Sequence, residues 1–177
     1  FSPASYDEQK FGTLERKAGM TIAVSIARPE SRGTIMATSP DPLARPAIRP
    51  NYLAVDNDLA VSVAGLKHAR RIFASPAFEA LRVGEIVPGP DVVTDADLAA
   101  FARRAGGTLY HPVGTCRMGE DPQAVVDSRL RVRGLSGLRV IDASIMPIVT
   151  TGNTNAPTIM IAEKGAAMIL EDRKAAA

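Results

Sequence analysis

The sequence lacks the features that would place it in several broad classes of protein. No apolar run reaches the roughly 18 residues that a membrane-spanning helix needs, and its start is too polar for a secretory signal peptide. Its 177 residues contain one cysteine, Cys116, so no disulfide can form within the chain. The net charge of +2, with scattered arginines, gives no sign of a nucleic-acid surface. We expect no membrane span, no nucleic-acid partner and a reducing, cytoplasmic location.

Several catalytic and cofactor motifs are missing as well. No G-x-S-x-G presents a nucleophilic serine, so a hydrolase is disfavoured. Cys116 has no second thiol or histidine at ligand spacing, and we expect no metal site. The G-x-G-x-x-G turn of dinucleotide-binding domains occurs nowhere, because the glycines of 114–119 and 134–137 have the wrong spacing.

What remains is a composition with 46% hydrophobic and 23% charged residues, which is enough to bury a core in one domain or two lobes. Apolar residues alternate with small or polar ones over 20–27 and 33–38, which predicts two antiparallel strands. A third extended segment is predicted over 47–53, at a sheet edge because of Pro50.

Helical spacing of apolar residues predicts a long amphipathic helix from about Asp56 to Ala74, with its apolar face on the sheet. Thr94 is typical of the residue that caps a helix, and the helix that follows should end at Gly106. A compact apolar strand is predicted over 138–141. Pro157 fits the first turn of a last helix that reaches about residue 171 and is apolar on nearly every side, so we expect it to be largely buried.

Two segments rich in glycine or proline carry the chemistry of this chain. The first, 110–119, reads YHPVGTCRMG, and the second, 151–158, reads TGNTNAPT. They contain a titratable imidazole, His111, and an amide, Asn155, in backbone where turns can fix a side chain and a planar ligand can approach the main chain. Such a pair can supply a base and a group that orients an oxygen atom.

These segments, together with 138–147 and blocks at 28–33, 41–42 and 50–53, resemble the C-terminal part of the glucose-methanol-choline (GMC) oxidoreductases, in a choline dehydrogenase-like form. The resemblance covers most of residues 20–171 in the family's order. It implies an FAD-dependent alcohol dehydrogenase or oxidase, which oxidises an alcohol to a carbonyl by hydride transfer to the flavin. Which alcohol is oxidised, and whether oxygen or another carrier reoxidises the flavin, is left open.

The resemblance makes His111 and Asn155 the catalytic pair. A neutral imidazole can take the hydroxyl proton near neutral pH; the alternative is a structural histidine in a loop. Asn155 matches the family's second catalytic position, which holds Asn in some members and His in others. An amide can donate to the substrate oxygen but does not titrate. Its alternative role is to cap the helix that starts at Pro157.

The resemblance also implies contacts with the cofactor. Asp142 and Ala143, which follow the predicted strand, match residues that meet the ribityl and phosphate part of FAD, although an Asp that stabilises a turn is the alternative. The start of the last helix presents N–H groups and partial positive charge, which would favour a reduced, anionic flavin edge. The residues expected at this edge are Asn153, Ala156, Pro157 and Thr158.

The absence of a dinucleotide turn predicts that the chain is the C-terminal portion of a longer enzyme, without the main cofactor cradle. We expect an α+β fold: an antiparallel sheet with helices on one face in a substrate-binding portion (1–109), followed by the catalytic loop and the C-terminal strand and helix of an FAD-binding domain (110–177). The fragment alone should be inactive without the N-terminal half, its main partner besides the alcohol. The alternative is a non-catalytic module that binds or self-associates as a homo-oligomer without flavin.

Overall fold

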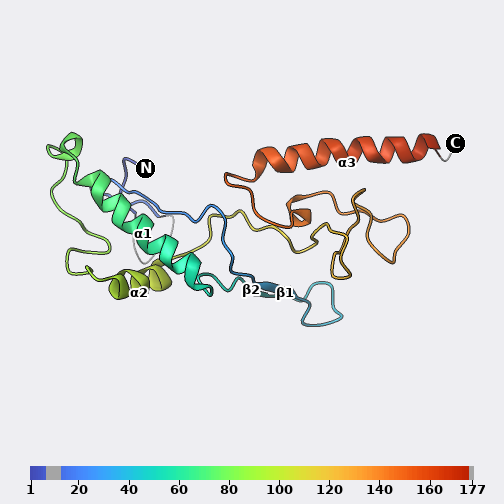
Figure 1. The fold of residues 1–177 in the computed structure, drawn as a ribbon, viewed down its shortest axis with the longest axis horizontal. Helices are drawn as coiled ribbons and strands as arrows, with labels where there is room; N and C mark the ends of the chain where they lie inside the picture. The colour runs from blue at the N-terminus through green and yellow to red at the C-terminus, as the bar shows by residue number, and fades with distance from the viewer. Residues whose placement is uncertain (7–12, 176–177) are drawn as a thin grey trace. The chain divides into compact units, whose positions relative to one another are not determined.

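The computed structural model describes residues 1–6 and 13–175, which divide into two compact units (Figure 1). Unit 1 comprises 1–26, 30–33 and 50–107, and unit 2 comprises 27–29, 34–49 and 108–177. The units do not test the predicted division at residue 109 into a substrate portion and a flavin portion, which stays a prediction.

Two helices form the centre of unit 1. Helix α1 (Asp56–Phe73) and helix α2 (Asp95–Ala105) pack against each other, with Val63, Leu98 and Ala102 buried. The Thr94 hydroxyl accepts the N–H of Asp97 while the Asp97 carboxylate accepts the N–H of Thr94, a reciprocal cap that fixes the start of α2. Both predicted helices are confirmed. A short 3₁₀ turn, η1 (Pro76–Phe78), follows α1.

Asp58 anchors the start of α1 to the segment before β1. Its side chain is 1% exposed, and its two carboxylate oxygens accept the N–H groups of Glu30 and Ser31, each at 2.8 Å. Burial by itself would raise the pKa of this carboxyl. The hydrogen bonds from the Ser31 side chain and from both backbone N–H groups, together with the charge of Arg32, outweigh burial and lower the pKa below its ordinary 3.8.

Replacing Asp58 with Asn is expected to lower the free energy of unfolding by roughly 2–3 kcal/mol at neutral pH, because an amide offers one acceptor oxygen to two buried donors. The pKa of Asp58 is lower in the folded protein than in the unfolded chain. Its carboxylate therefore contributes fully to the free energy of unfolding at a pH above the unfolded pKa, and this contribution is lost as the pH falls through the folded pKa. Urea unfolding followed by circular dichroism should show the difference between wild type and D58N shrinking on acidification. Asp56→Asn, an exposed change in the same turn, is the control; a D58N difference that persists unchanged in acid would contradict the assignment.

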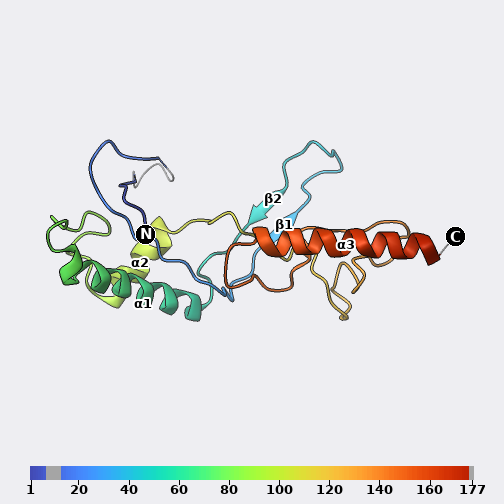
Figure 2. The same ribbon diagram turned by 90° about the horizontal axis from the view of Figure 1, so that it is seen from above.

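The sheet of unit 2 is a two-stranded antiparallel ribbon. Strand β1 (Thr34–Met36) pairs with β2 (Ala47–Arg49), with Ile35 opposite Ile48, and the loop between them projects as a hairpin (Figure 2). The extended segment predicted at 33–38 is therefore confirmed in its central residues, and the one predicted at 47–53 is confirmed in its first three residues. The strand predicted over 20–27 is wrong: that segment contains a single bridge, between Thr21 and Ser2, and β1 takes β2 as its partner instead.

The loops of 108–146, which contain few regular elements, form the core of unit 2 together with one side of the last helix. The buried side chains of this core are Val126, Leu130, Ile145, Met146 and Ile161. The predicted strand 138–141 is also wrong, because the only pairing in that stretch is an isolated bridge between Arg131 and Arg139. The chain then forms a short 3₁₀ turn, η2 (Ala143–Ile145).

Helix α3 (Asn155–Ala175) runs past these loops as one long element (Figures 1 and 2). It packs along the stripe Ile161, Gly165, Met168 and Asp172. A Cβ added at Gly165 would lie 2.5 Å from Ile141, so the helix approaches that side chain closely. The end of the stripe is held by ion pairs from Arg129 and Arg139 to Asp172.

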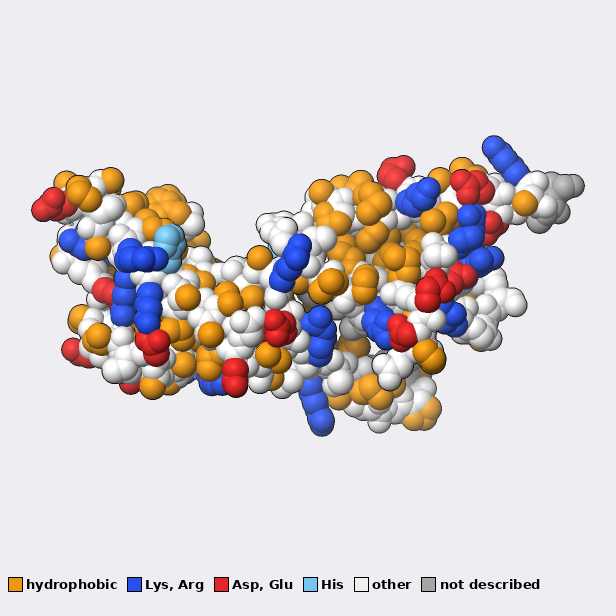
Figure 3. Space-filling model, viewed as in Figure 1, with side chains coloured by type: hydrophobic (Ala, Val, Ile, Leu, Met, Phe, Trp, Pro, Cys, Tyr) orange, Lys and Arg blue, Asp and Glu red, His pale blue; other side chains and the backbone are white. Residues whose placement is uncertain are grey.

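The expectation that this last helix is largely buried is wrong. Only Ile161 and Gly165 are buried, and apolar side chains lie at the surface along α3 (Figure 3). The large exposed ones are Ile159 (55%), Met160 (59%), Ile169 (36%) and Leu170 (57%). Apolar residues on every side of a helix indicate a surface suited to burial, but the described chain covers only one stripe of the surface of α3.

The fold therefore mixes helices with a small antiparallel sheet, which confirms the α+β class in outline. The packing of helices on one face of the sheet stays a prediction, because α1 and α2 belong to unit 1 and the β1–β2 ribbon belongs to unit 2. No helix in the described residues has both the length and the apolar character that crossing a membrane requires.

Candidate functional site

His111 lies in the irregular segment that follows α2, directly after a residue with unusual backbone geometry. Tyr110 has a φ of 62°, in the left-handed region that is costly for a bulky residue, and its N–H donates to the Thr108 hydroxyl at 2.9 Å. Backbone held in a sparsely populated conformation is common where a side chain must point in a set direction. The turn at Tyr110 thus sets the direction from which the imidazole leaves the main chain.

The His111 ring is held at both nitrogens by the segment that precedes α3. Nδ1 lies 2.9 Å from the hydroxyl oxygen of Thr154, and Nε2 lies 3.0 Å from the amide nitrogen of Asn153. The ring itself is half-buried, Thr154 is 8% exposed, and Asn153 is exposed. The structure therefore brings together the two segments that the sequence singled out, although they are more than forty residues apart.

Backbone hydrogen bonds tie the loop after His111 to η2. Cys116 N–H donates to the Ser144 carbonyl at 3.0 Å, and Met118 N–H donates to the Ile145 carbonyl at 2.8 Å. Gly114 has a φ of 89°, and a Cβ there would lie 3.3 Å from the Met146 carbonyl oxygen, so a side chain at this turn would be strained. These contacts place η2, and with it Asp142 and Ala143, in the same compact unit as His111.

Arg117 and Asp121 stabilise the tip of this loop. The guanidinium donates to both carboxylate oxygens at 2.7 and 2.6 Å, and this hydrogen bonding lowers the pKa of Asp121 to about 2. Because the pair neutralises its own charge, it adds little to the field at His111. Cys116 is half-buried, and the described residues contain no group of His, Cys, Asp and Glu side chains arranged to hold a metal ion.

Asn155 is the first residue of α3 and is exposed. Its side chain makes no hydrogen bond within the described residues, and the contacts to His111 come from the two residues before it, Asn153 and Thr154. Its alternative role as the cap of a helix starting at Pro157 is wrong, since the helix already includes Asn155. The catalytic roles of His111 and Asn155 stay predictions.

The start of α3 offers backbone donors. In the described part of the chain, the N–H groups of Asn155 and Ala156 have no acceptor, and Pro157 has no N–H. The Thr158 hydroxyl donates to the Thr154 carbonyl at 2.6 Å, so it stabilises the helix start itself. Two free donors at the positive end of a 21-residue helix fit an anionic edge of a planar cofactor.

Asp142 stabilises the turn η2. Its Oδ1 accepts the N–H of Ser144 at 2.8 Å and also the Ser144 hydroxyl. The alternative interpretation of Asp142 as a turn-stabilising residue thus agrees with the geometry. Asp142 is exposed, and its Oδ2 makes no hydrogen bond among the described residues, so a ribityl hydroxyl could still donate to it.

Thr154 is the site residue that the sequence analysis missed. It lies between Asn153 and Asn155 in the segment already singled out, and a hydroxyl is a ready partner for an imidazole. The sequence indicated that the segments 110–119 and 151–158 act together. It could not show which residue of the second segment contacts His111, because a threonine is not recognisable as a histidine partner without the fold.

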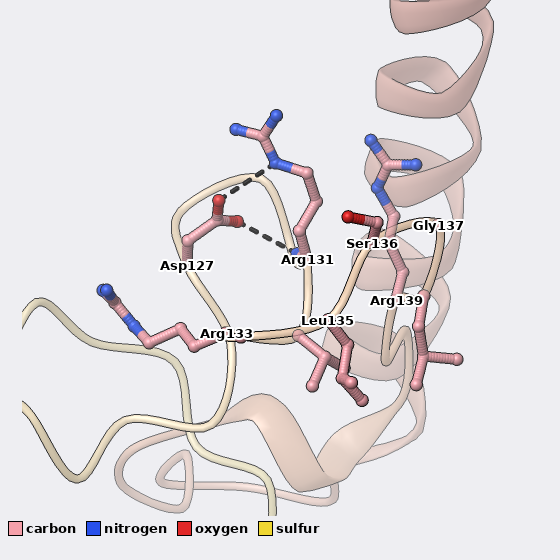
Figure 4. A pocket seen from close by; sticks show the side chains of 10 residues that line it. Asp127, Arg131, Arg133, Leu135, Ser136, Gly137 and Arg139 are labelled. Carbon is pink, nitrogen blue, oxygen red and sulfur yellow. Dashed lines mark hydrogen bonds and ion pairs between the residues drawn. The ribbon is translucent and has the colours of Figure 1, made fainter.

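A separate hollow of about 470 Å³ lies among the arginine-rich turns of 131–139 (Figure 4). It is not a second candidate site, because the arginine side chains that line it already bind other groups of the protein. Arg131 pairs with Asp127, Arg133 donates to the Gly119 carbonyl, and Arg139 pairs with Asp172. None of the residues predicted to act in catalysis or to contact the cofactor lines it.

Comparison with known proteins gives a consistent result. A family model described as GMC oxidoreductase matches residues 29–162, more than half of the chain. An alcohol dehydrogenase [acceptor] of Pseudomonas putida is 50% identical over 152 residues, which are 86% of this chain and 28% of that protein. An oxygen-dependent choline dehydrogenase of Chromohalobacter salexigens is 50% identical over 146 residues, 82% of this chain and 26% of the relative.

A solved structure shares the fold. The FAD-dependent oxidoreductase from Chaetomium thermophilum matches with a TM-score of 0.78 at 30% identity, over 83% of this chain and 26% of that protein. The chain thus spans only about a quarter of the length of the relatives that it matches.

Proposed function

The chain belongs to the glucose-methanol-choline (GMC) oxidoreductase family, and from this membership we propose that it is the C-terminal portion of an FAD-dependent enzyme that oxidises an alcohol to a carbonyl compound. FAD, when bound, accepts the hydride from the alcohol carbon. The observation that carries the proposal is the His111 imidazole, half-buried and held at both nitrogens by the segment that leads into α3.

In this proposal His111 takes the proton of the alcohol hydroxyl. Removing that proton raises electron density on the oxygen, which helps to expel a hydride from the adjoining carbon. The exposed Asn155 amide donates to the same oxygen and orients it. Because an amide does not titrate, the proton goes to the imidazole alone.

The residues at the start of α3 have the chemistry needed to bind a flavin. The unsatisfied N–H groups of Asn155 and Ala156 would face the anionic edge of the reduced ring, with Asn153, Pro157 and Thr158 lining it. Asp142, with Ala143, would bind the ribityl and phosphate part. The main dinucleotide cradle would come from an N-terminal half that this chain does not contain, and a cytoplasmic location stays a prediction.

The test uses the complete protein that carries these residues. Purified protein should show a flavin absorbance band at about 450 nm that bleaches when choline or a simple primary alcohol is added anaerobically. The absence of bleaching with every alcohol tried, in protein that does hold flavin, would contradict alcohol oxidation. Comparing choline with an uncharged alcohol of similar size tests the choline dehydrogenase-like assignment separately.

A second candidate is a module without flavin that self-associates. The exposed apolar side chains of α3 favour it, because contiguous apolar surface is suited to contact with another protein surface. A colourless preparation that stays inactive with added FAD and forms oligomers in light scattering would support this candidate over the enzyme.

A further inference from the structure

The buried Thr154 hydroxyl has a role that goes beyond its place in the loop. We infer that Thr154 is a positioning residue for His111: its oxygen accepts the proton of Nδ1 and thereby leaves Nε2 as the nitrogen that can receive a proton. The assignment of this tautomer rests on the hydrogen bonds of the ring. The use of Nε2 in alcohol oxidation rests on the proposed function.

The hydrogen-bond pattern at the ring determines where the proton lies. The amide nitrogen of Asn153 is only a donor, and it lies 3.0 Å from Nε2, so Nε2 must offer its lone pair. A neutral imidazole has one N–H, which therefore belongs to Nδ1. The Thr154 hydroxyl oxygen, 2.9 Å from Nδ1, is the acceptor of that proton.

The two partners of the ring differ in how easily a substrate could displace them. Thr154 is 8% exposed, and its carbonyl accepts both the N–H and the hydroxyl of Thr158, at 3.0 and 2.6 Å, so it is fixed to the first turn of α3. Asn153 is exposed. A substrate hydroxyl can therefore replace the Asn153 amide as the donor to Nε2, while the bond from Nδ1 to Thr154 remains.

The contact with Thr154 matters because the wrong tautomer cannot act as the base. If the proton moved to Nε2, the nitrogen that faces Asn153 would be a donor and could no longer accept the hydroxyl proton. Without the Thr154 oxygen, the Asn153 amide would be the one remaining contact in the described residues that favours a proton on Nδ1, and this exposed amide can turn its oxygen toward Nε2 or give way to a substrate. A partner that fixes the tautomer of a functional histidine is a common requirement for its reactivity.

The first experiment measures the tautomer directly. In the complete protein labelled with ¹⁵N-histidine, at alkaline pH where an imidazole is neutral, the His111 signals should show a protonated Nδ1 and a bare Nε2. Thr154→Val, which keeps the shape and removes the hydroxyl, should move the proton wholly or partly to Nε2. Thr154→Ser should keep the wild-type pattern, and so should the control Thr151→Ala, which changes an exposed threonine of the same segment.

The second experiment separates this inference from the proposed function. Thr154→Val should lower kcat for alcohol oxidation by about 10-fold with little change in KM, and Thr154→Ser should restore most of it. A wild-type spectrum with the proton on Nε2, or a Val variant that keeps it on Nδ1, overturns the inference. If the Val variant does not fold, the wild-type and Ser spectra still decide the tautomer. Should the tautomer be as inferred while His111→Ala oxidises alcohol at the normal rate, the proposed function fails and the tautomer assignment stands.

Discussion

Replacing His111 with Ala in the complete protein is expected to slow reduction of the flavin by the alcohol by about 10²-fold or more. The variant removes the group proposed to take the hydroxyl proton, so the hydride would have to leave a neutral alcohol. The ring is half-buried in unit 2 and is not one of the buried residues of its core. Among the described residues, the side chains that hydrogen-bond to it are those of Thr154 and Asn153, so its loss leaves the core untouched. The measurement is the rate of flavin bleaching after anaerobic mixing in a stopped-flow spectrometer.

The chain provides a matched control. His68 is its other histidine, exposed on α1 with its ring beside Arg71. His68→Ala should reduce its flavin at the wild-type rate. Equal rates for wild type and His111→Ala, with the flavin content unchanged, would remove His111 from the proton transfer.

The helices of unit 1 could be predicted because their signals are local. Thr94 and Asp97 stand three residues apart and cap each other, and the apolar stripe of α1 repeats at the helical period. Such features need no knowledge of the rest of the fold. The buried role of Asp58 could not be predicted in this way, because its carboxylate binds the backbone of Glu30 and Ser31, nearly thirty residues earlier in the chain.

The strands were harder, because a strand exists only when another segment pairs with it. Alternation over 20–27 is as regular as that over 33–38, yet the first forms a single bridge, from Thr21 to Ser2, and only the second pairs as a strand, with β2. The apolar run 138–141 likewise packs in a core of loops, with Val140 and Ile141 against its buried side chains. In each case the residue pattern identified a segment suited to burial, but it did not show which other segment packs against it.

The same limit applies to α3 and to the candidate site. The sequence located His111 and the segment 151–158, because both lie in distinctive turns, but the atoms that contact the ring belong to Asn153 and Thr154. Which residue of three in a row faces the imidazole depends on where α3 begins. That boundary was predicted two residues late, at Pro157 instead of Asn155, and with it the expected role of Asn155 as a cap.

The position of Asn155 inside the helix makes its substitution a clean test. Asn155→Ala is expected to slow flavin reduction by about 10²-fold, the usual effect of deleting one donor to a reacting oxygen. Alanine is favourable in a helix, and the residue that precedes α3 is Thr154, so the helix start should survive the change. Asn155→His keeps a donor and should retain more activity than Ala, whereas Asn155→Asp, which offers only acceptors when ionised, should not. Asn57→Ala, on α1, is the matched control.

Combining the two changes tests whether His111 and Asn155 act on one oxygen. If the Asn155 amide orients the hydroxyl whose proton the His111 imidazole takes, the amide can accelerate flavin reduction only a little once the imidazole has been removed. The double variant should then lose clearly less than the product of the two single losses, as groups acting in one step usually do. Independent, multiplicative losses would place Asn155 in a different step, such as flavin binding, and a double-mutant cycle on the bleaching rate separates the two outcomes.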